Sequence, residues 1–417
     1  MNLKYNLNDR PPFGQLMGYS LQWFVMAVAV VSTSVFVAQG SDAEKLFFAQ
    51  KLFAMMGIAG LLQVVIGHKL PLVIGPAAVL LVGVMSSYRA GADTSAIYSS
   101  IAIGGALIAL LTIGGGLRKI QRLFTPRIVV VILMLIAFTL TPVITRLVFV
   151  DNPKEGEHEF GLIFAIVGTV CMLIANRTWK GVGKSLVVPV AIIFGCVIYY
   201  IIFPTKIEAE TAASVRGMFL PEFKFDAGLI VAFVICYIAL LINDIGSIES
   251  LGAMLDADNM DKRLKRGVRL TGIMNVVAGS MGVLGPVNYS MSPGIIASSG
   301  CASRYALIPS CLALMLCALS PHFIWLMAHI PHPVVGGVML FLMGTQVAAS
   351  LEMIRTTQSV QSFQDALTIG LPILIAILFG ALPKDVVPEI IEPLLGNGFA
   401  MGVITVVVME HIINRNR

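Results

Sequence analysis

One apolar run of the sequence ends in side chains that can carry a proton or bind an ion. The run 238–242 is followed directly by Asn243 and Asp244, and Ser247 follows shortly after. An ionisable residue is costly in lipid, so a carboxylate at this place predicts a functional group. A buried Asp244 can carry a proton, and an ionised one can ligate Na⁺, which makes it the candidate ion-coupling residue. The alternative is an interfacial aspartate that caps the amphipathic stretch 248–258.

Glycine and proline interrupt two other apolar segments in a similar manner. Residues 70–79 read LPLVIGPAAV, and residues 286–296 read PVNYSMSPGII. Proline removes a backbone donor and disfavours helix in the residue before it, and such backbone survives at membrane depth only inside protein or along a cavity. A helix that starts after each break offers free N–H groups with positive partial charge. The pair predicts a substrate site, although each proline alone is also typical of an ordinary helix start.

The composition places these segments in a membrane. The chain has 417 residues, of which 57% are hydrophobic and 12% charged, and its mean hydropathy is +0.89. Soluble domains carry roughly 25% charged residues, and an apolar segment of about 20 residues spans a bilayer. On this criterion the sequence predicts fourteen spans, near 14–39, 47–67, 70–86, 95–116, 128–150, 161–176, 186–203, 227–246, 268–284, 285–300, 304–320, 333–351, 366–383 and 397–414.

The charged loops predict the orientation of the chain. Basic residues gather after the fourth, sixth and eighth predicted spans, whereas the loops 151–159 and 208–224 on the opposite side are acidic or mixed. Cytoplasmic loops carry an excess of Lys and Arg, so we expect both termini in the cytoplasm and the chain in the inner (plasma) membrane. This topology also accounts for the net charge of +5, without a nucleic-acid partner.

A short motif recurs at an offset of seven spans. Residues 126–130 (PRIVV) open the fifth span and residues 331–335 (PHPVV) open the twelfth, and the same register aligns 134–135 with 339–340. An odd number of spans in each repeat inverts the second copy in the membrane, as in many secondary transporters. The alternative is a chance recurrence, because proline suits the first turn of any helix.

No motif supports catalysis or a cofactor. Residues 181–185 (GVGKS) end like a phosphate-binding loop, but the upstream glycine of that motif falls on Thr178. The histidines of 329–332 (HIPH) flank a proline, unlike the helical HExxH of metalloproteases. The six cysteines form no CxxC pair and are expected as small core hydrophobes. We therefore expect no enzyme, no cofactor and no metal site.

Several segments together resemble one transporter family in their order and spacing. They are Leu21-Gln22, 70–75, 123–130, NDIG at 243–246, the basic stretch 262–269, NYSMSPG at 288–294 and ASRY at 302–305. These segments resemble the nucleobase–ascorbate transporter family, also called nucleobase:cation symporter family 2, which includes uracil, xanthine and urate permeases. The resemblance covers nearly the whole chain.

The resemblance implies a fold and a mechanism. It implies an all-α membrane protein of fourteen spans in two inverted repeats of seven, with short strands in the broken spans three and ten. Substrate would lie between those strands in a core domain, here residues 1–117 and 227–330. A gate domain, here residues 118–226 and 331–417, would lie against it, and an elevator-like movement would exchange access. A homodimer surrounded by membrane lipid is also implied.

The chain departs from the family at several binding positions. The family usually places Glu at the position of Asn243, Glu or Gln and then Asn at Met291 and Ser292, His at Trp23 and an aromatic residue at Ala78. Side chains that hydrogen-bond a nucleobase in relatives are therefore replaced, and methionine is only a weak acceptor. The resemblance thus supports the scaffold more firmly than it supports a particular substrate.

The predicted substrate site combines the polar end of the eighth span with the two breaks. Asn243 suits the amide edge of a flat heterocycle, and Trp23 and Tyr289 are candidates to stack on it, with packing as the alternative for Trp23. The full set is Gln22, Trp23, Gly75, Pro76, Ala77, Ala78, Asn243, Asp244, Ser247, Tyr289, Ser290, Met291, Ser292 and Gly294. We expect a secondary active importer of a nucleobase (xanthine, urate or uracil) coupled to H⁺ or Na⁺. The alternative is an anion transporter of the sulfate or bicarbonate type on the same fold.

Overall fold

The computed structural model describes residues 3–113, 116–117, 125–150, 153–179, 183, 186–204, 218–220, 222–289, 292–383 and 395–414. Within these residues the regular structure is helical, apart from one pair of short strands and one isolated bridge. Eight helices there are long and apolar enough to cross a membrane, or nine if the bent pair Arg304–Ala318 and Pro321–Ala328 counts as one span. The chain is therefore an all-α, multi-span membrane protein.

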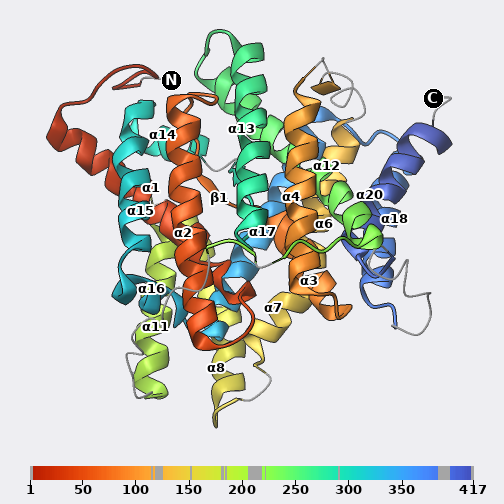
Figure 1. The fold of residues 1–417 in the computed structure, drawn as a ribbon, viewed down its shortest axis with the longest axis horizontal. Coiled ribbons are helices and arrows are strands. Elements are labelled where there is room, and N and C mark those ends of the chain that lie inside the picture. Colours follow the sequence, from red (N-terminus) through yellow and green to blue (C-terminus); the bar gives the residue numbers. More distant parts are fainter. Residues whose placement is uncertain are drawn as a thin grey trace.

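Every predicted apolar segment contains at least one helix. The helices are α1 (Phe13–Ser32), α2 (Asp42–Val65), α3 (Ala78–Arg89), α4 (Thr94–Leu111), α6 (Pro126–Thr139), α7 (Thr141–Val148), α8 (Glu157–Ile163), α9 (Thr169–Thr178), α11 (Val187–Ile202), α12 (Ala227–Met254), α13 (Met260–Ser280), α14 (Ser292–Ser299), α15 (Leu307–Ala318), α16 (Pro321–Ala328), α17 (His332–Thr357), α18 (Phe363–Gly380) and α20 (Gly398–Val408). A π-helical turn, Phe164–Gly168, joins α8 to α9, and another, Met409–Ile413, extends α20. The two chain ends lie on the same side of the bundle (Figure 1), which fits an even number of membrane crossings.

The structure corrects the expected ends of two segments. The hydropathy pattern predicted that Asp244 lies near the end of its segment. In the structure α12 continues to Met254, and Asp244 therefore lies inside the helix. The basic residues 262–269 belong to α13 and do not form a loop. Lys, Arg and Leu have high helix propensity, and a helix can therefore continue beyond its apolar part.

Helix length identifies fewer spans than the fourteen that hydropathy predicts. α3, α11 and α20 with its π-helical turn are apolar but shorter than the other candidate spans. α14 is shorter still, and α15 is bent from α16 by 88°. Hydropathy registers every apolar stretch, whereas an interrupted segment leaves only a short helix after its break. The two breaks precede α3 and α14, so the interruptions account for part of the difference.

The two predicted breaks form the strands of the described structure. β1 (Ile74–Pro76) and β2 (Pro286–Asn288) pair antiparallel, with Gly75 opposite Val287 at the centre. All residues of both strands are buried. Broken backbone inside a membrane protein needs internal hydrogen bonds, and each strand supplies them to the other. The prediction of two strand-containing broken segments is confirmed.

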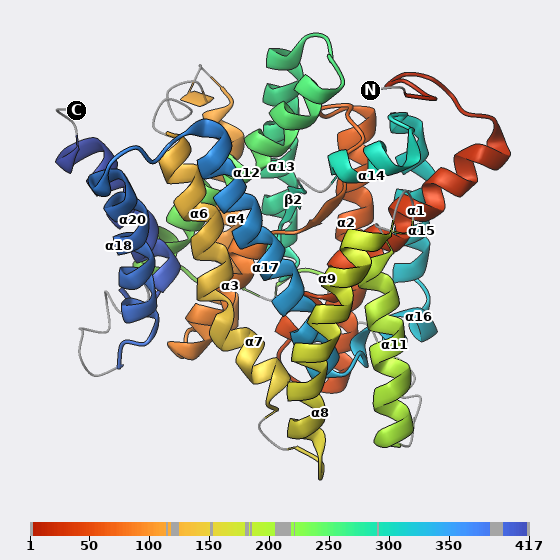
Figure 2. The same cartoon turned by 180° about the vertical axis from the view of Figure 1, so that it is seen from behind.

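Two sets of helices pack mainly within themselves. In the first set, α4 packs against α13 and α12, and α15 packs against α2 and α1. In the second set, α17 packs against α6 and α7, and α18 packs against α6 and α20. Figures 1 and 2 show α1 and α15 toward one edge of the molecule and α18 and α20 at the other. The strand pair contacts α1, α2, α12 and α13, so it belongs to the first set.

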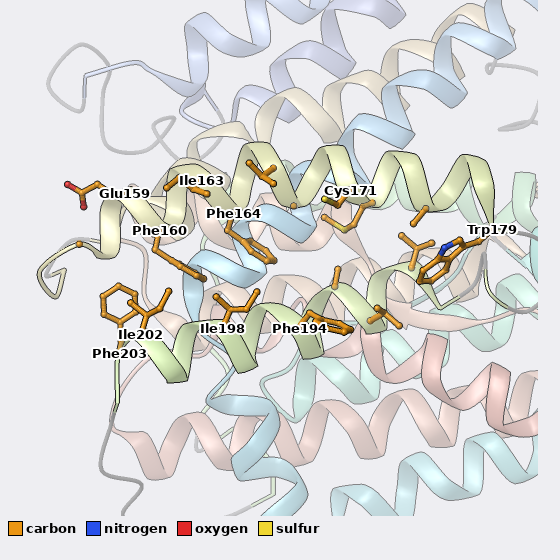
Figure 3. Close-up of a pocket in the computed structure, with 18 of the residues that line it drawn as sticks. Glu159, Phe160, Ile163, Phe164, Cys171, Trp179, Phe194, Ile198, Ile202 and Phe203 are labelled. Carbon is orange, nitrogen blue, oxygen red and sulfur yellow. The ribbon is translucent and has the colours of Figure 1, made fainter.

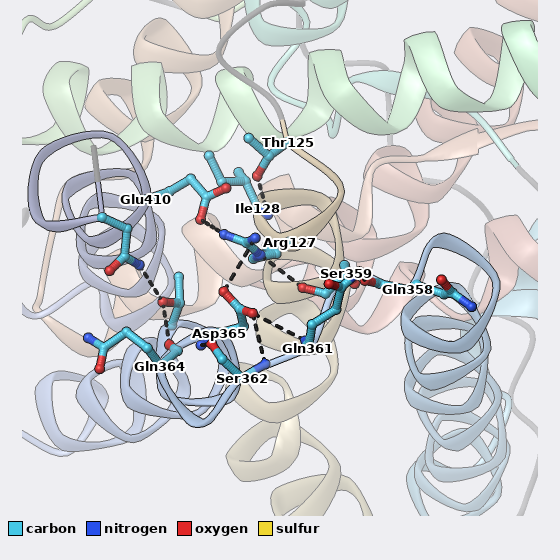
Figure 4. A network of polar contacts seen from close by, with 12 residues as sticks. Thr125, Arg127, Ile128, Gln358, Ser359, Gln361, Ser362, Gln364, Asp365 and Glu410 are labelled. Carbon is cyan, nitrogen blue, oxygen red and sulfur yellow. Dashed lines mark hydrogen bonds and ion pairs between the residues drawn. The ribbon is translucent and has the colours of Figure 1, made fainter. Parts of the chain in front are cut away.

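Arg127 in the first turn of α6 joins three elements of the second set (Figure 4). Its guanidinium lies 3.1 Å from Glu410, which follows α20, and 3.3 Å from Asp365 in the first turn of α18. Its Nε also donates to the Ser359 carbonyl at 2.9 Å, in the connection between α17 and α18. The side chains of Arg127, Asp365 and Glu410 are only 29, 16 and 7% exposed. Removing the cation would therefore leave two largely buried carboxylates without compensation.

We predict that Arg127→Met lowers the free energy of unfolding by about 2–4 kcal/mol, because a largely buried ion pair loses one partner. Thermal unfolding of the purified protein measures the change. Arg355→Met is the matched control, because Arg355 pairs with Glu352 on the surface, at 75 and 56% exposure. Exposed pairs contribute about 0–1 kcal/mol. Equal losses in the two variants would contradict a structural role for the Arg127 cluster.

Candidate functional site

A cavity of about 320 Å³ lies beside the strand pair. This volume is at the lower end of the range for small-molecule pockets, roughly 300–1,000 Å³. Both sets of helices contribute to its lining, the first through α1, β1–α3, α12 and β2, the second through α6 and α17. The lining residues are Val30, Thr33, Ser34, Ala77, Ala78, Val79, Leu81, Leu133, Ile136, Leu140, Leu240, Asn243, Val287, Tyr289, Met339, Leu342, Met343, Thr345, Gln346 and Ala349.

Two side-chain amides reach this cavity, Asn243 from α12 and Gln346 from α17. Both residues are partly exposed. Within the described part of the chain, no hydrogen bond engages either amide group. Each amide offers two donors and one acceptor oxygen. Since no described lining residue is charged, these amides are the groups best able to recognise a neutral polar ligand.

The first turn of α3 presents backbone donors to the same cavity. Its N-cap residue, Ala77, has extended backbone, and no side chain caps the helix. The first N–H groups of a helix lack partners within the helix and carry positive partial charge. Ala77, Ala78 and Val79 all line the cavity. A ligand carbonyl can therefore accept hydrogen bonds here, whatever the side chains.

Tyr289 lines the cavity and joins the two breaks. Its hydroxyl donates to the Pro76 carbonyl at 2.7 Å, and its backbone N–H donates to the Val73 carbonyl at 2.9 Å. Gly75 permits this close packing, because a Cβ at this position would lie 2.5 Å from Val30 Cγ1 and 2.8 Å from Tyr289 Cε2. Real Cβ atoms do not approach other heavy atoms so closely. The glycine is therefore required by packing against its neighbours.

Two of the predicted substrate residues hold backbone in place. Ser292 Oγ accepts a hydrogen bond from the Val73 N–H at 2.9 Å and donates to the Tyr289 carbonyl at 3.1 Å. Ser247 Oγ donates to the Asn288 carbonyl at 3.0 Å. Both serines are buried, and neither lines the cavity. Their hydroxyls satisfy backbone groups at the breaks that the short strands leave unpaired.

Asp244 is fully buried beside β2. Its Oδ1 accepts hydrogen bonds from the backbone N–H and the side-chain amide of Asn288, at 3.1 and 2.7 Å. Its Oδ2 has no hydrogen-bond partner among the described residues. The carboxyl group does not line the cavity, but Val287 and Tyr289, on either side of Asn288, do. Asp244 is therefore connected to the cavity through one strand.

Other predicted residues lie away from the cavity or outside the described residues. Trp23 is 2% exposed and packs in the hydrophobic core, and Gln22 beside it is also buried. Gly294 belongs to α14, whereas Ser290 and Met291 fall outside the described residues. The predicted residues that line the cavity are Ala77, Ala78, Asn243 and Tyr289.

The sequence prediction did not include the polar cavity residues of α1 and α17. These are Thr33 and Ser34 at the end of α1, and Thr345 and Gln346 within α17. Each pair is a polar interruption of an apolar segment, which is a signal for function at membrane depth. The signal is weak, because hydroxyl groups also bond to their own helix, as Thr345 does to the Leu342 carbonyl at 2.7 Å.

A larger groove of about 690 Å³ lies between α8–α9 and α11. Figure 3 shows Phe160, Phe164 and Phe194 along this groove, with Trp179 toward one end and Glu159 toward the other. Its lining is almost entirely apolar, and these helices expose many large hydrophobic side chains, as helices that face lipid do. Ligand sites combine apolar walls with a few placed polar groups. The smaller cavity meets this description and the groove does not.

Interrupted helices that meet at a buried strand pair, beside a cavity with few polar groups, are typical of membrane transporters. Residues 14–385 match the family model of the xanthine/uracil permeases, which is described as the permease family. The chain belongs to this family. It is therefore a transport protein and not an enzyme, and the resemblance inferred from the sequence motifs is confirmed.

Relatives named for nucleobase, xanthine and uric acid transport align with most of the chain. The nucleobase transporter PlUacP of Paenibacillus larvae is 24% identical, over 90% of this chain and 88% of its own length. The xanthine permease XanP of Escherichia coli K12 is 24% identical, over 98% and 94%. The uric acid permease PucK of Bacillus subtilis is 25% identical, over 82% of each chain.

Solved structures share the fold at low sequence identity. The transmembrane domain of the cyanobacterial bicarbonate transporter BicA has a TM-score of 0.64 and 15% identity, over 89% of this chain and 98% of that domain. The murine anion transporter Slc26a9 in its inward-facing state has a TM-score of 0.61 and 12% identity, over 99% of this chain and 69% of its own. This likeness concerns the fold alone.

We predict that Gly75→Ala lowers the free energy of unfolding by about 1–3 kcal/mol, because the added methyl group displaces Val30 and the Tyr289 ring. Thermal unfolding of the purified protein measures the effect. Gly246→Ala on α12 is the matched control, because a Cβ there meets no atom within 4 Å. If Gly75→Ala is tolerated as well as Gly246→Ala, the packing at the strand pair is not as tight as described.

Proposed function

We propose that this permease is a secondary active importer of a nucleobase, of the xanthine, urate or uracil kind. The observation that carries the proposal is the small cavity at the strand pair, in which the unpaired amides of Asn243 and Gln346 accompany the uncapped first turn of α3. Relatives named for xanthine and uric acid transport support the same substrate class.

The chemistry of a nucleobase matches this cavity. The edges of such a ring alternate N–H donors and carbonyl acceptors, and an amide side chain can pair with both. Carbonyl oxygens on another edge can accept from the backbone N–H groups of α3. The apolar walls and Tyr289 suit the flat faces of the ring. Among the described residues the lining holds no basic side chain, which favours a neutral base over the sulfate or bicarbonate alternative.

We further propose Asp244 as the ion-coupling residue, for H⁺ or Na⁺. Its bare Oδ2 is a free site for a cation, while Oδ1 is held by Asn288. A buried carboxyl group changes its interactions strongly when its charge changes. Because Asn288 belongs to the strand that lines the cavity, such a change would reach the substrate. The carboxyl group would then couple cation binding to substrate binding without touching the substrate.

The helix contacts support the proposal of fourteen spans in two inverted repeats of seven. On that assignment, α2 and α4 are spans two and four, and α13 and α15 are their counterparts nine and eleven. The repeat relates α4 to α15 and α13 to α2, so the α4–α13 contact in one arrangement corresponds to the α15–α2 contact in the other. Both contacts are extensive. The contacts α12–α4 and α1–α15 are exchanged in the same manner. Such paired contacts are what an internal two-fold relation between the halves would produce.

The division into two helix sets supports a core and a gate. The proposed core comprises residues 1–117 and 227–330, and the proposed gate comprises residues 118–226 and 331–417. The core contributes Asn243 and the gate contributes Gln346 to one cavity, so a sliding of one domain along the other would open it alternately to the two sides. We keep as proposals the inner-membrane location with cytoplasmic termini, and the homodimer that the resemblance implies.

We predict that Asn243→Leu and Gln346→Leu each raise the KM for the transported base about tenfold or more, because each removes hydrogen bonds to the ring. Uptake of radiolabelled xanthine, urate and uracil by cells lacking their own permeases measures this. Gln364→Leu on α18 is the control, because that residue lies outside the cavity lining. Uptake of none of these bases by the unaltered protein would refute the proposed function.

We predict that Asp244→Asn abolishes accumulation of the base against a gradient, because an amide cannot exchange the coupling cation. Exchange of internal for external base should persist, since the cavity is unaltered. Asp256→Asn is the matched control, because Asp256 is exposed beyond α12 and its φ of 48° suits asparagine equally well. Normal accumulation by Asp244→Asn protein would remove this carboxyl group from the mechanism.

A further inference from the structure

Three buried side chains form a hydrogen-bonded series that ends on Asp244. Asn288 lies at its centre: its amide Nδ2 is 2.7 Å from Asp244 Oδ1, and its Oδ1 is 3.0 Å from His68 Nε2. All three residues have no exposed surface. His68 comes from the turn after α2, Asn288 from β2 and Asp244 from α12. The hydrogen-bonded series therefore connects three elements that are distant in sequence.

The hydrogen bond at the His68 end of this series fixes which groups in it donate and which accept. His68 Nδ1 accepts from the Leu70 backbone N–H at 2.9 Å. Burial lowers the pKa of His68 to about 4, so the ring is neutral at physiological pH. A neutral imidazole carries one proton, which must then lie on Nε2. Nε2 donates to Asn288 Oδ1, and the amide consequently presents its NH₂ group to Asp244.

The turn that carries His68 is itself held from two sides. Arg263 of α13 donates from Nη1 to the His68 carbonyl at 3.0 Å. Gly267, one turn further along α13, faces the His68 ring so closely that a Cβ there would lie 3.0 Å from His68 Cβ. Lys69 has a left-handed φ of 58°, which turns the chain toward β1. The ring is therefore fixed in place by its surroundings.

Few charged groups act on Asp244, at the other end of the hydrogen-bonded series. Thr271 of α13 faces the carboxyl group, but no hydrogen bond of normal geometry joins it to Oδ2. α4, α14 and α20, which pack against α12, contain no charged residue, and the one charge of α3, Arg89, is its last residue. Among the charges of α13, Arg263 acts on His68, at the other end of the hydrogen-bonded series. The hydrogen bonds from Asn288 are thus the main polar contacts of Asp244.

We propose that His68 is a positioning residue for ion coupling. It locks the Asn288 amide in one orientation, so that Asp244 Oδ1 always receives N–H donors and Oδ2 alone is left to take the cation. The flipped amide would place an oxygen against the carboxylate. This inference rests on the proposed role of Asp244 in coupling. His68 lines neither the cavity nor any surface, so it acts only through Asn288.

The test compares His68→Phe, which removes the donor, with His68→Gln, whose amide can replace the Nε2–H group. In His68→Phe the pH profile of uptake should move upward by about one pH unit, since a donor to the carboxylate is weakened. The KM for the base at saturating cation should change less than twofold. His68→Gln should restore the profile, and His329→Phe, at an exposed histidine, should not alter it.

An infrared titration makes the test independent of transport. The band of the protonated Asp244 carboxyl group is identified by its loss in Asp244→Asn protein, and its midpoint pH is measured in purified, monodisperse samples. An upward shift in His68→Phe, reversed in His68→Gln, supports the inference even if no base is transported. An unchanged midpoint, or no Asp244 band between pH 5 and 9, overturns it. Nucleobase uptake by the unaltered protein would then still support the proposed function.

Discussion

Backbone N–H and C=O groups at the two breaks need hydrogen-bond partners inside the membrane, and this requirement governs the structure. Two segments give up their helical hydrogen bonds at Gly75-Pro76 and around Pro286, where lipid offers no replacement partners. The three-residue strands β1 and β2 supply those partners to one another. Ser292 adds a bond to the Val73 N–H just before β1, and Ser247 adds one to the Asn288 carbonyl at the end of β2. The remaining helices of the first set enclose this crossing, which explains why its residues are buried.

The same constraint creates the candidate site. A helix that begins at a break has an uncapped first turn, and α3 directs that turn into a cavity. The strands bring Tyr289 and Asn288 from one half of the chain against Val73 and Pro76 from the other. β2 and the residue after it therefore carry a cavity wall, on Val287 and Tyr289, and the contact with Asp244, on Asn288. The cavity and the buried carboxyl group are joined by adjacent residues.

The sequence was informative wherever a single segment decided the outcome. Apolar runs located the helices, and Gly75-Pro76 and Pro286 located the breaks, because these residues cannot continue a helix without cost. Asn243 was singled out because it follows an apolar run directly and its amide suits the edge of a flat heterocycle. The ends of α12 and α13 were predicted wrongly, since hydropathy follows the membrane and not the helix.

Contacts between distant segments could not be predicted from the residues alone. Asn288 was visible in a motif, but its bonds to Asp244 and His68 depend on the register of two three-residue strands. Ser292 was expected at the substrate, whereas its hydroxyl is used by the Val73 N–H. Gln346 was overlooked because a lone glutamine in α17 gives no indication of which helix it faces. Each of these outcomes is set by packing between the halves.

The most direct test of the account is a structure of the protein determined with xanthine or urate bound. The account predicts density for the base in the cavity beside β1 and β2, within hydrogen-bond distance of Asn243, Gln346 and the first N–H groups of α3. Density in the groove between α8–α9 and α11, or at any place away from the strand pair, would contradict it.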